Sequence, residues 1–211
     1  MKFVVTAGPT REFADPVRFL SNPSTGRMGF AVAQAARSAG HEVTLVAGPV
    51  SLKTPSGVRR VDVVSARDML AALRAEVVHA DVLVMTAAVA DWRPARRAKM
   101  KLKKSEMSGV LKLVRNPDIL KTLRRVPGLV RIGFAAETGM PDVEAARKCR
   151  EKGLDLAVGN DVTRPDSGFG TRTNRVAFVT PDGRVQHLPL MSKLAVARRI
   201  VAFAERIASN G

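Results

Sequence analysis

The sequence contains few of the residues that build disulfides and metal clusters. One of its 211 residues is a cysteine, Cys149, so the chain forms no internal disulfide and no thiolate metal cluster. The three histidines, His41, His79 and His187, lie far apart and show no ligand spacing. We therefore expect no dedicated protein site for a metal ion.

Aromatic residues and long apolar runs are also scarce. Aromatic residues make up 4% of the chain, with one tryptophan and no tyrosine, so few side chains can stack on nucleic-acid bases. No stretch approaches the roughly 20 apolar residues of a membrane span. Residues 1–5 run straight into a strand-like segment without a signal-type apolar segment. We expect a cytoplasmic protein that has no membrane partner.

Acidic residues are outnumbered by basic ones. The chain has 19 Asp and Glu against 35 Lys and Arg, which gives a formal net charge of +16. This excess favours anionic partners such as nucleotides or nucleic acid, although a solvated basic surface fits the composition equally well. The segment 93–115 is the most basic, and its glycine and serines predict a mobile flap over a site.

Short apolar runs alternate with helical patterns over most of the chain. This alternation predicts βαβ units, and hence an α/β fold with a Rossmann-like open, mostly parallel sheet flanked by helices, in one domain over residues 1–211. Near the carboxyl end, residues 175–179 and 185–188 predict an antiparallel hairpin before a last helix over 193–207. The predicted parallel strands are 3–7, 42–47, 60–64, 81–89, 129–134 and 154–158, and the helices run from Met28 to Gly40, over 65–77, over 117–121 with Asn116 as the cap, and over 142–152.

The loop after the first strand is the strongest local indication of a binding site. It has roughly twenty residues, where strand-to-helix connections usually need about 2 to 6. It leaves the carboxyl edge of a parallel strand and enters a helix, which is where open α/β sheets bind ligands. Its arginines, hydroxyl residues, Asn22 and the glycines Gly26 and Gly29 suit an anion.

Two common nucleotide-binding motifs are missing. The turn after the first strand lacks G-x-G-x-x-G, and the second strand ends at Gly48 and Pro49 without an acidic residue for a ribose. No G-x-x-x-x-G-K-[ST] motif occurs. A bound nucleotide would therefore use another arrangement.

Several short motifs, taken in order, resemble the phosphopantothenate-cysteine ligase family, the synthetase half of the bifunctional coenzyme A flavoprotein. The resemblance covers nearly the whole chain. Threonine at position 25 and arginine at position 27 replace the serine and lysine that are commoner in the family; the first change keeps a hydroxyl and the second keeps a cation. The motifs are TAGPTRE at 6–12, DPVR at 15–18, SN at 21–22, GRMG at 26–29, AAVADWRP at 87–94, KLKK at 101–104, NPDIL at 116–120, GFAAET at 133–138 and NDV at 160–162.

The resemblance implies a ligase of coenzyme A biosynthesis with CTP, 4′-phosphopantothenate and cysteine as its reactants. Mg²⁺ is expected as the counter-ion of the triphosphate. No flavin is expected, because the chain lacks the flavin-dependent decarboxylase half. A separate phosphopantothenoylcysteine decarboxylase is an expected partner. A homodimer is expected, formed through about 160–190. The preference for CTP over ATP, the residues that bind cysteine, and whether the chain is a natural single-domain protein or an excised domain stay open at this level.

The resemblance also assigns roles to single positions. It makes Asn22, Arg18 and Lys101 the catalytic residues, with Lys101 also contacting the triphosphate. The substrate-binding positions are Ser24, Thr25, Gly26 and Arg27. The remaining nucleotide-binding positions are Met85, Thr86, Ala87, Asp91, Pro117, Asp118, Ile119, Leu120, Phe134, Lys148 and Lys152.

Two other classes of function fit parts of the sequence. A nucleic-acid-binding module would use the basic segment 93–115, and its affinity would fall steeply with salt. A nicotinamide-dependent reductase would use a similar fold, and cofactor binding would identify it.

Overall fold

The computed structural model describes residues 1–103 and 109–209, and an eight-stranded sheet forms the centre of this described part. The strand order is β13-β12-β10-β9-β6-β1-β4-β5. The six strands from β10 to β5 are parallel, and β12 and β13 are antiparallel to their neighbours, as the sequence predicts. The strands are β1 (Lys2–Ala7), β4 (Glu42–Ala47), β5 (Arg59–Asp62), β6 (Val82–Met85), β9 (Val130–Glu137), β10 (Leu156–Asp161), β12 (Ala177–Val179) and β13 (Val185–His187).

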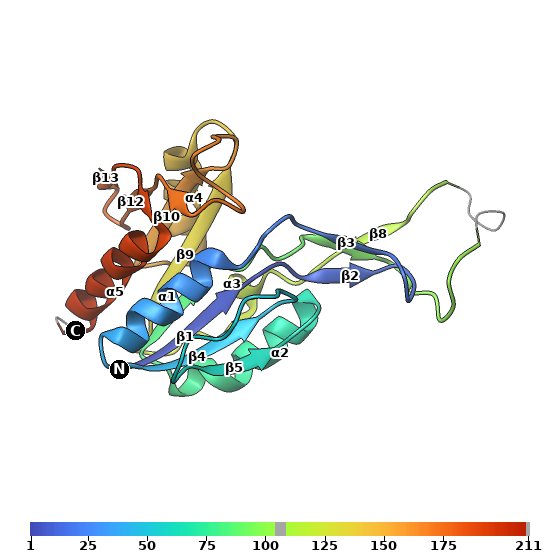
Figure 1. Ribbon diagram of the computed structural model, residues 1–211, viewed down its shortest axis with the longest axis horizontal. Helices are drawn as coiled ribbons and strands as arrows, with labels where there is room; N and C mark the ends of the chain where they lie inside the picture. The colour runs from blue at the N-terminus through green and yellow to red at the C-terminus, as the bar shows by residue number, and fades with distance from the viewer. Residues whose placement is uncertain (104–108, 210–211) are drawn as a thin grey trace.

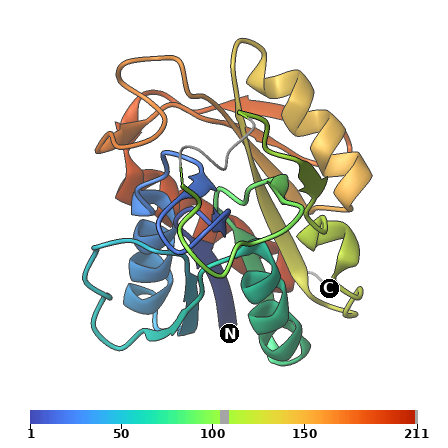
Figure 2. The ribbon, with the colours of Figure 1, turned by 90° about the vertical axis from the view of Figure 1, so that its right-hand side faces the viewer.

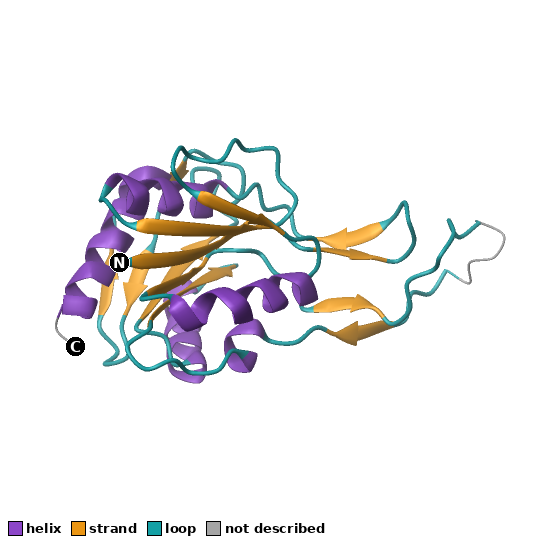
Figure 3. Cartoon of the chain, turned by 90° about the horizontal axis from the view of Figure 1, so that it is seen from below, coloured by secondary structure: helices purple, strands orange, loops and turns teal. Residues whose placement is uncertain are grey.

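Helices cover both faces of the sheet (Figure 3). Helices α1 (Arg27–Ser38) and α5 (Lys193–Ser209) share one core cluster with alternate residues of β1, among them Phe3 and Val5. Val4 faces the opposite cluster, which includes residues of α2 (Ala66–Glu76), α3 (Ile119–Thr122) and α4 (Pro141–Lys152). Because both faces are buried, the central strands are continuously apolar. A short 3₁₀ helix, η1 (Val77–His79), follows α2.

The strand order creates a switch point between β1 and β6. The chain leaves β1 through α1 to reach β4 on one side, then returns through α2 to β6 on the other side of β1. The loops that follow β1 and β6 therefore diverge, and the crevice between such loops is the usual ligand site of open α/β sheets.

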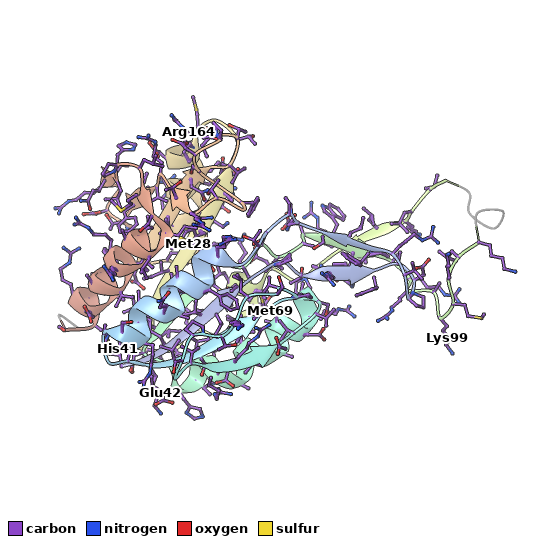
Figure 4. The ribbon with its side chains drawn as sticks, in the orientation of Figure 1. Met28, His41, Glu42, Met69, Lys99 and Arg164 are labelled. Carbon is purple, nitrogen blue, oxygen red and sulfur yellow. The ribbon has the colours of Figure 1, made fainter. Side chains whose placement is uncertain are left out.

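These two loops extend into a projecting arm (Figure 1), seen end-on in Figure 2, which we define as residues 11–21, 92–103 and 109–115. The first part is the hairpin of β2 (Arg11–Phe13) and β3 (Phe19–Ser21), and the second is the hairpin of β7 (Trp92–Pro94) and β8 (Leu113–Arg115). Neither hairpin is predicted from the sequence, because three-residue strands give no periodic pattern. Lys99 lies far out on the arm in Figure 4.

Several predicted elements have other bounds in the structure. The strand predicted over 81–89 ends at Met85, because the next backbone N–H groups donate to side chains of the first strand and its loop. The assignment of Asn116 as a helix cap was wrong. Asp118 caps α3 by accepting the backbone N–H of Lys121, whereas the Asn116 side chain donates to the backbone oxygen of Ala90 at 2.8 Å.

The carboxyl-terminal part contains the predicted hairpin and one further strand pair. The hairpin is β12 and β13, which begins at Ala177, two residues after the predicted start. A second, short pair joins β11 (Thr173–Asn174) to β14 (Met191–Ser192), directly before α5. Of the predicted flap, residues 104–108 lie outside the described residues. No helix in the described part of the chain is long and apolar enough to cross a membrane.

Candidate active site

A cavity of about 700 Å³ opens at the carboxyl ends of β1, β6 and β9, where the topology places the switch point. We call it the large cavity. Its wall contains predicted site residues that lie far apart in the sequence, from Asn22 to Lys152. The predicted residues on this wall are Asn22, Met85, Ala87, Asp91, Pro117, Asp118, Ile119, Leu120, Phe134, Lys148 and Lys152.

Asn22 is held against the loop that follows β6. Its Nδ2 donates to the backbone oxygen of Ala88 at 3.1 Å, and the hydroxyl of the preceding Ser21 donates to the backbone oxygen of Thr10 at 2.7 Å. An amide nitrogen has two hydrogens, so one donor of Asn22 is left for a ligand. The position is thus fixed before any ligand binds.

Two buried threonines of the first strand and its loop shape the floor of the site. Thr6 Oγ1 accepts the backbone N–H groups of Thr86 and Ala87, each at 3.1 Å, and Thr10 Oγ1 accepts that of Ala90 at 3.0 Å. Both threonines are fully buried. These bonds turn the chain out of the sheet after Met85 and place residues 87–90 along the large cavity.

The far wall carries two lysines one turn apart on α4. Lys148 Nζ donates to the backbone oxygen of Phe134 at 2.6 Å, and burial lowers the pKa of this ammonium. Lys152 pairs with Asp118 at the start of α3. Burial raises the pKa of Asp118, but the bonds from Lys152 and the backbone N–H of Lys121 outweigh it, so the net pKa is lowered. Both lysines line the large cavity.

Arg18 and Lys101 lie on the arm and not on the walls of the described cavities. Asp15, whose side chain is fully buried, accepts the guanidinium of Arg18 at 2.6 Å and the backbone N–H of Leu102 at 3.2 Å. Arg18 in turn donates to the backbone oxygen of Leu102 at 2.8 Å. We call this contact of three residues the arm latch, and it ties the segment containing Lys101 to the first hairpin.

A smaller cavity of about 50 Å³ lies beside the large one and shares Phe134, Ala136 and Phe169 with it. The predicted substrate-binding residues Ser24, Thr25, Gly26 and Arg27 line it, together with Thr86, so Thr86 lies on this wall and not on that of the large cavity. Gly26 has a φ of +78° and precedes α1, which no side chain caps. Met28, labelled in Figure 4, is the second residue of the same helix and also lines this cavity.

The structure adds residues that the sequence analysis did not assign to a site. Some of these residues lie inside the motifs that the chain shares with the ligase family, so the motifs could have identified them. Phe169, Gly168, Asn174 and Lys193 have no such signal, because only the fold brings them to the wall. The added residues are Ala88, Val89, Ala90, Trp92, Arg115, Asn116, Ala136, Glu137 and Phe169 in the large cavity, and Met28, Asn160, Gly168, Asn174 and Lys193 in the smaller one.

The large cavity contains carboxylates suited to a hard cation but no preformed metal cluster. Asp91 and Glu137 line it, and their oxygen atoms are the ligands that Mg²⁺ prefers. Within residues 1–103 and 109–209, no group of three or more His, Cys, Asp or Glu side chains is placed to hold a metal ion. The large cavity can therefore contribute carboxylate oxygens to a cation that is already bound to a ligand.

The fold and this placement of the cavities define a Rossmann-like α/β protein that binds its ligand at the carboxyl ends of the strands. The model of one family, the DNA/pantothenate metabolism flavoprotein C-terminal domain, matches residues 1–207. The chain belongs to this family.

Curated relatives agree with this assignment. The chain is 45% identical over 202 residues to the coenzyme A biosynthesis bifunctional protein CoaBC of Vibrio vulnificus strain YJ016, covering 94% of this chain and 50% of that protein. It is 45% identical over 200 residues to the protein of the same name from Bacillus subtilis strain 168, covering 94% and 49%. The chain thus spans about half the length of the curated relatives it matches.

Solved structures share the fold. The crystal structure of the C-terminal domain of CoaBC has a TM-score of 0.84 and 41% sequence identity, and the match covers 100% of this chain and 96% of that one. A Cab2 H337A mutant in complex with phosphopantothenate-cysteine has a TM-score of 0.80 at 16% identity, with 99% and 88% covered. At that identity the likeness extends to the fold alone.

Proposed function

We propose that this domain is a phosphopantothenate-cysteine ligase of coenzyme A biosynthesis, which joins 4′-phosphopantothenate and cysteine through an acyl-cytidylate formed from CTP. The observation that carries the proposal is the large cavity at the switch point, whose wall contains the residues that the family resemblance assigns to the nucleotide, apart from Thr86 and Lys101. Membership of the family and the relatives named CoaBC support it.

The reaction has two displacements. A carboxylate oxygen of 4′-phosphopantothenate attacks the α-phosphorus of CTP, and pyrophosphate leaves. The amine of cysteine then attacks the acyl carbon, loses a proton and releases CMP. Both steps bring anions together, so fixed cations and oriented N–H groups lower the barrier.

The large cavity supplies such groups on its far wall. Lys148 and Lys152 offer two ammonium groups, and we assign them to the nucleotide with the segment 117–120 and Phe134. Mg²⁺ bound to the triphosphate would neutralise further charge, and Asp91 and Glu137 are the carboxylates that can face it.

We assign the acyl centre to Asn22, whose amide can donate to the carbonyl oxygen of the acyl-cytidylate. Arg18 and Lys101 reach this centre only if the arm moves, because the arm latch holds them outside the cavity walls. We propose that residues 93–115 close over bound CTP and carry Lys101 to the triphosphate.

The experiment that tests the function is pyrophosphate release by the purified protein with 4′-phosphopantothenate, cysteine and Mg²⁺, supplied with CTP or ATP. We expect release that requires phosphopantothenate and prefers CTP. An Asn22→Ala variant should lose about 10²- to 10³-fold in turnover, the usual effect of removing one donor to a developing oxyanion. Gln186→Ala, an exposed amide on β13, is the matched control and should keep full activity.

Absence of pyrophosphate release with either nucleotide from a folded protein would reject the ligase. The second candidate is then a nucleic-acid-binding module, favoured by the exposed cations on the arm, such as Arg96, Arg97 and Lys99. Binding of RNA or DNA that falls steeply with salt would support it.

We further propose a homodimer in the cytoplasm, which would also associate with a separate decarboxylase where none is fused to the domain. The predicted dimer segment 160–190 exposes Phe169, Val185 and Leu190. The arm exposes more apolar side chains, which makes it a second candidate interface. These are Val17, Phe19, Leu20, Trp92, Met100, Val110, Leu111 and Leu113.

A further inference from the structure

Asn116 lies where the second hairpin of the arm joins the body of the domain. The chain leaves the body after Asp91 and returns to it at Asn116, and the backbone N–H of Asn116 donates to the backbone oxygen of Asp91 at 2.7 Å. On the body side of this bond lie two segments of the large cavity wall, residues 87–91 and 117–120. The whole hairpin separates these segments in sequence, so their relative position depends on contacts at its root.

The side chain of Asn116 adds a second bond across the root. Its Nδ2 donates to the backbone oxygen of Ala90 at 2.8 Å, and its Oδ1 accepts the guanidinium of Arg93 at 3.2 Å. Arg93 also donates to the backbone oxygen of Arg115. A backbone oxygen only accepts and a guanidinium only donates, so these partners fix the direction in which the amide points. Asn116 therefore has a defined geometry before any ligand binds.

The first of the two segments is held firmly by the loop that follows β1. The hydroxyls of Thr6 and Thr10 accept its backbone N–H groups, as described above. The backbone N–H of Ala88 donates to the backbone oxygen of Gly8 at 2.9 Å, and the oxygen of Ala88 accepts the N–H of Thr10 at 3.3 Å. Residues 87–90 therefore keep their place without help from Asn116.

The second segment is anchored mainly at its far end. Ile119 and Leu120 are buried in the core, with exposed fractions of 4% and 8%. At the near end, Pro117 has no N–H to donate. The bonds that fix this end to residues 87–91 therefore come from Asn116, and loss of the Asn116 amide would shift the near end of 117–120.

We propose that Asn116 is a positioning residue for the nucleotide, and that its amide sets the spacing between residues 87–91 and 117–120, the two segments assigned to CTP. This inference rests on the proposed function. The acyl centre would keep its geometry, because Asn22 bonds to Ala88, which the loop after β1 holds in place. Loss of the amide should therefore weaken the binding of CTP selectively.

Two variants separate the two ends of the amide. Asn116→Asp keeps the size of the side chain and the acceptor for Arg93, but it places a carboxylate oxygen against the backbone oxygen of Ala90. Arg93→Met removes the guanidinium and leaves the amide donor in place. Gln186→Glu makes the same change from amide to acid at an exposed position of β13, so it is the matched control.

The first measurement is the KM for CTP and for 4′-phosphopantothenate, by pyrophosphate release. We expect Asn116→Asp to raise the KM for CTP by about tenfold to a hundredfold, the effect of losing one hydrogen bond and leaving its acceptor unpaired. The KM for 4′-phosphopantothenate and kcat at saturating CTP should stay unchanged. Arg93→Met should raise the KM for CTP less, and Gln186→Glu should match the wild type.

The second measurement uses Trp92, the only tryptophan in the sequence, and needs no ligand. Trp92 follows Asp91 and pairs with Arg115 across the hairpin, and its ring centroid lies 5.3 Å from the guanidinium carbon of Arg115. Its quenching by acrylamide therefore reports on the root of the hairpin. We expect stronger quenching in Asn116→Asp than in the wild type and in Gln186→Glu.

Two results would overturn the inference. One is wild-type quenching of Trp92 in Asn116→Asp, because Asn116 would then not fix the root. The other is an equal rise of both KM values, because the substitution would then disturb the whole cavity and not the spacing of the two segments. Failure of the proposed function looks different. The wild type itself would then release no pyrophosphate, while the quenching of Trp92 would still decide whether Asn116 fixes the root.

Discussion

At the scale of single residues, Gly29 shows how closely α1 packs on β1 beneath the site. A Cβ at this position would lie 2.5 Å from Ala7 Cβ, 2.5 Å from Thr86 Oγ1 and 2.6 Å from the Thr6 backbone oxygen. No real side chain tolerates such distances, and two of the three atoms are in or beside the floor of the cavity. The helix must therefore carry glycine here.

We predict that Gly29→Ala destabilises the protein by about 1–3 kcal/mol, the usual cost of overpacking. Thermal unfolding should show a melting temperature lower by about 2–4 °C for each kcal/mol. Ser38→Ala, at an exposed position of the same helix, should stay within about 0.5 kcal/mol of the wild type. Equal melting temperatures for Gly29→Ala and the wild type would refute the close packing.

Lys193 should make stability depend on pH. Burial, with the nearby Arg27 guanidinium, lowers its pKa from 10.5 to about 8 in the folded state, so the unfolded chain binds more protons between these values. Stability from this group therefore rises as pH increases from about 8 to 10.5. We therefore compare the free energy of unfolding of the wild type and of Lys193→Met by urea unfolding at pH 7.5 and at pH 10. We predict that the wild-type value minus the variant value is larger at pH 10 than at pH 7.5. The same difference taken with Lys53→Met, at an exposed position, should stay flat, and a flat difference for Lys193→Met would contradict the prediction.

At the scale of elements, the arm latch controls where the basic segment lies. Asp15 binds both Arg18 and Leu102, so one buried carboxylate joins the two hairpins of the arm. Burial raises the pKa of Asp15, but the Arg18 guanidinium and the backbone N–H groups of Val17, Arg18 and Leu102 outweigh it, and the net pKa lies well below its usual range. Asp15 is thus charged at neutral pH.

We predict that Asp15→Asn releases the arm. Trypsin should cleave faster after the basic residues of 93–103, because an amide cannot replace the charged acceptor that holds the arm. Asp62→Asn removes a carboxylate whose side chain is 72% exposed and pairs with Arg60 on β5, so it should leave the cleavage rate unchanged. Unchanged cleavage in Asp15→Asn would show that other contacts hold the arm.

The sequence predicts the repeating elements better than the irregular ones. The parallel sheet and α1 follow from apolar periodicity, and the structure agrees with them. Lys148 and Lys152 came from the family resemblance and not from periodicity, and both line the large cavity. The arm hairpins were missed because strands of three residues carry no period. The Asn116 cap was wrong because local pattern cannot distinguish it from Asp118, two residues later. Lys193 was missed because a lysine at the start of a helix normally lies in solvent, and only the loop at Gly168 buries it.

At the scale of the whole molecule, exposed apolar side chains concentrate on the arm, which projects from the body of the domain (Figure 1). The predicted dimer segment 160–190 exposes fewer of them, at Phe169, Val185 and Leu190. A projecting structure of this kind buries little surface within its own chain. In our proposal, a second copy of the chain covers the exposed apolar side chains.

We predict a dimer by light scattering with size-exclusion chromatography, and two variants identify the face that forms it. Val185→Asp charges the segment 160–190, and Leu113→Asp charges the arm, at positions that are 43% and 40% exposed. The variant at the true interface should elute as a monomer, because a buried, unpaired carboxylate is costly. A monomeric wild type across micromolar concentrations would reject the dimer.

Thr6 has a consequence for any redesign of this domain. It is a fully buried position in a strand, where packing and strand propensity both favour valine of nearly the same shape. Valine there would remove the acceptor of two backbone N–H groups on the floor of the site. A library selected for folding alone would thus accept valine at position 6, although the loop that forms the floor of the site would have lost its fixed position. Selection for stability and selection for activity should therefore give different residues at this buried position.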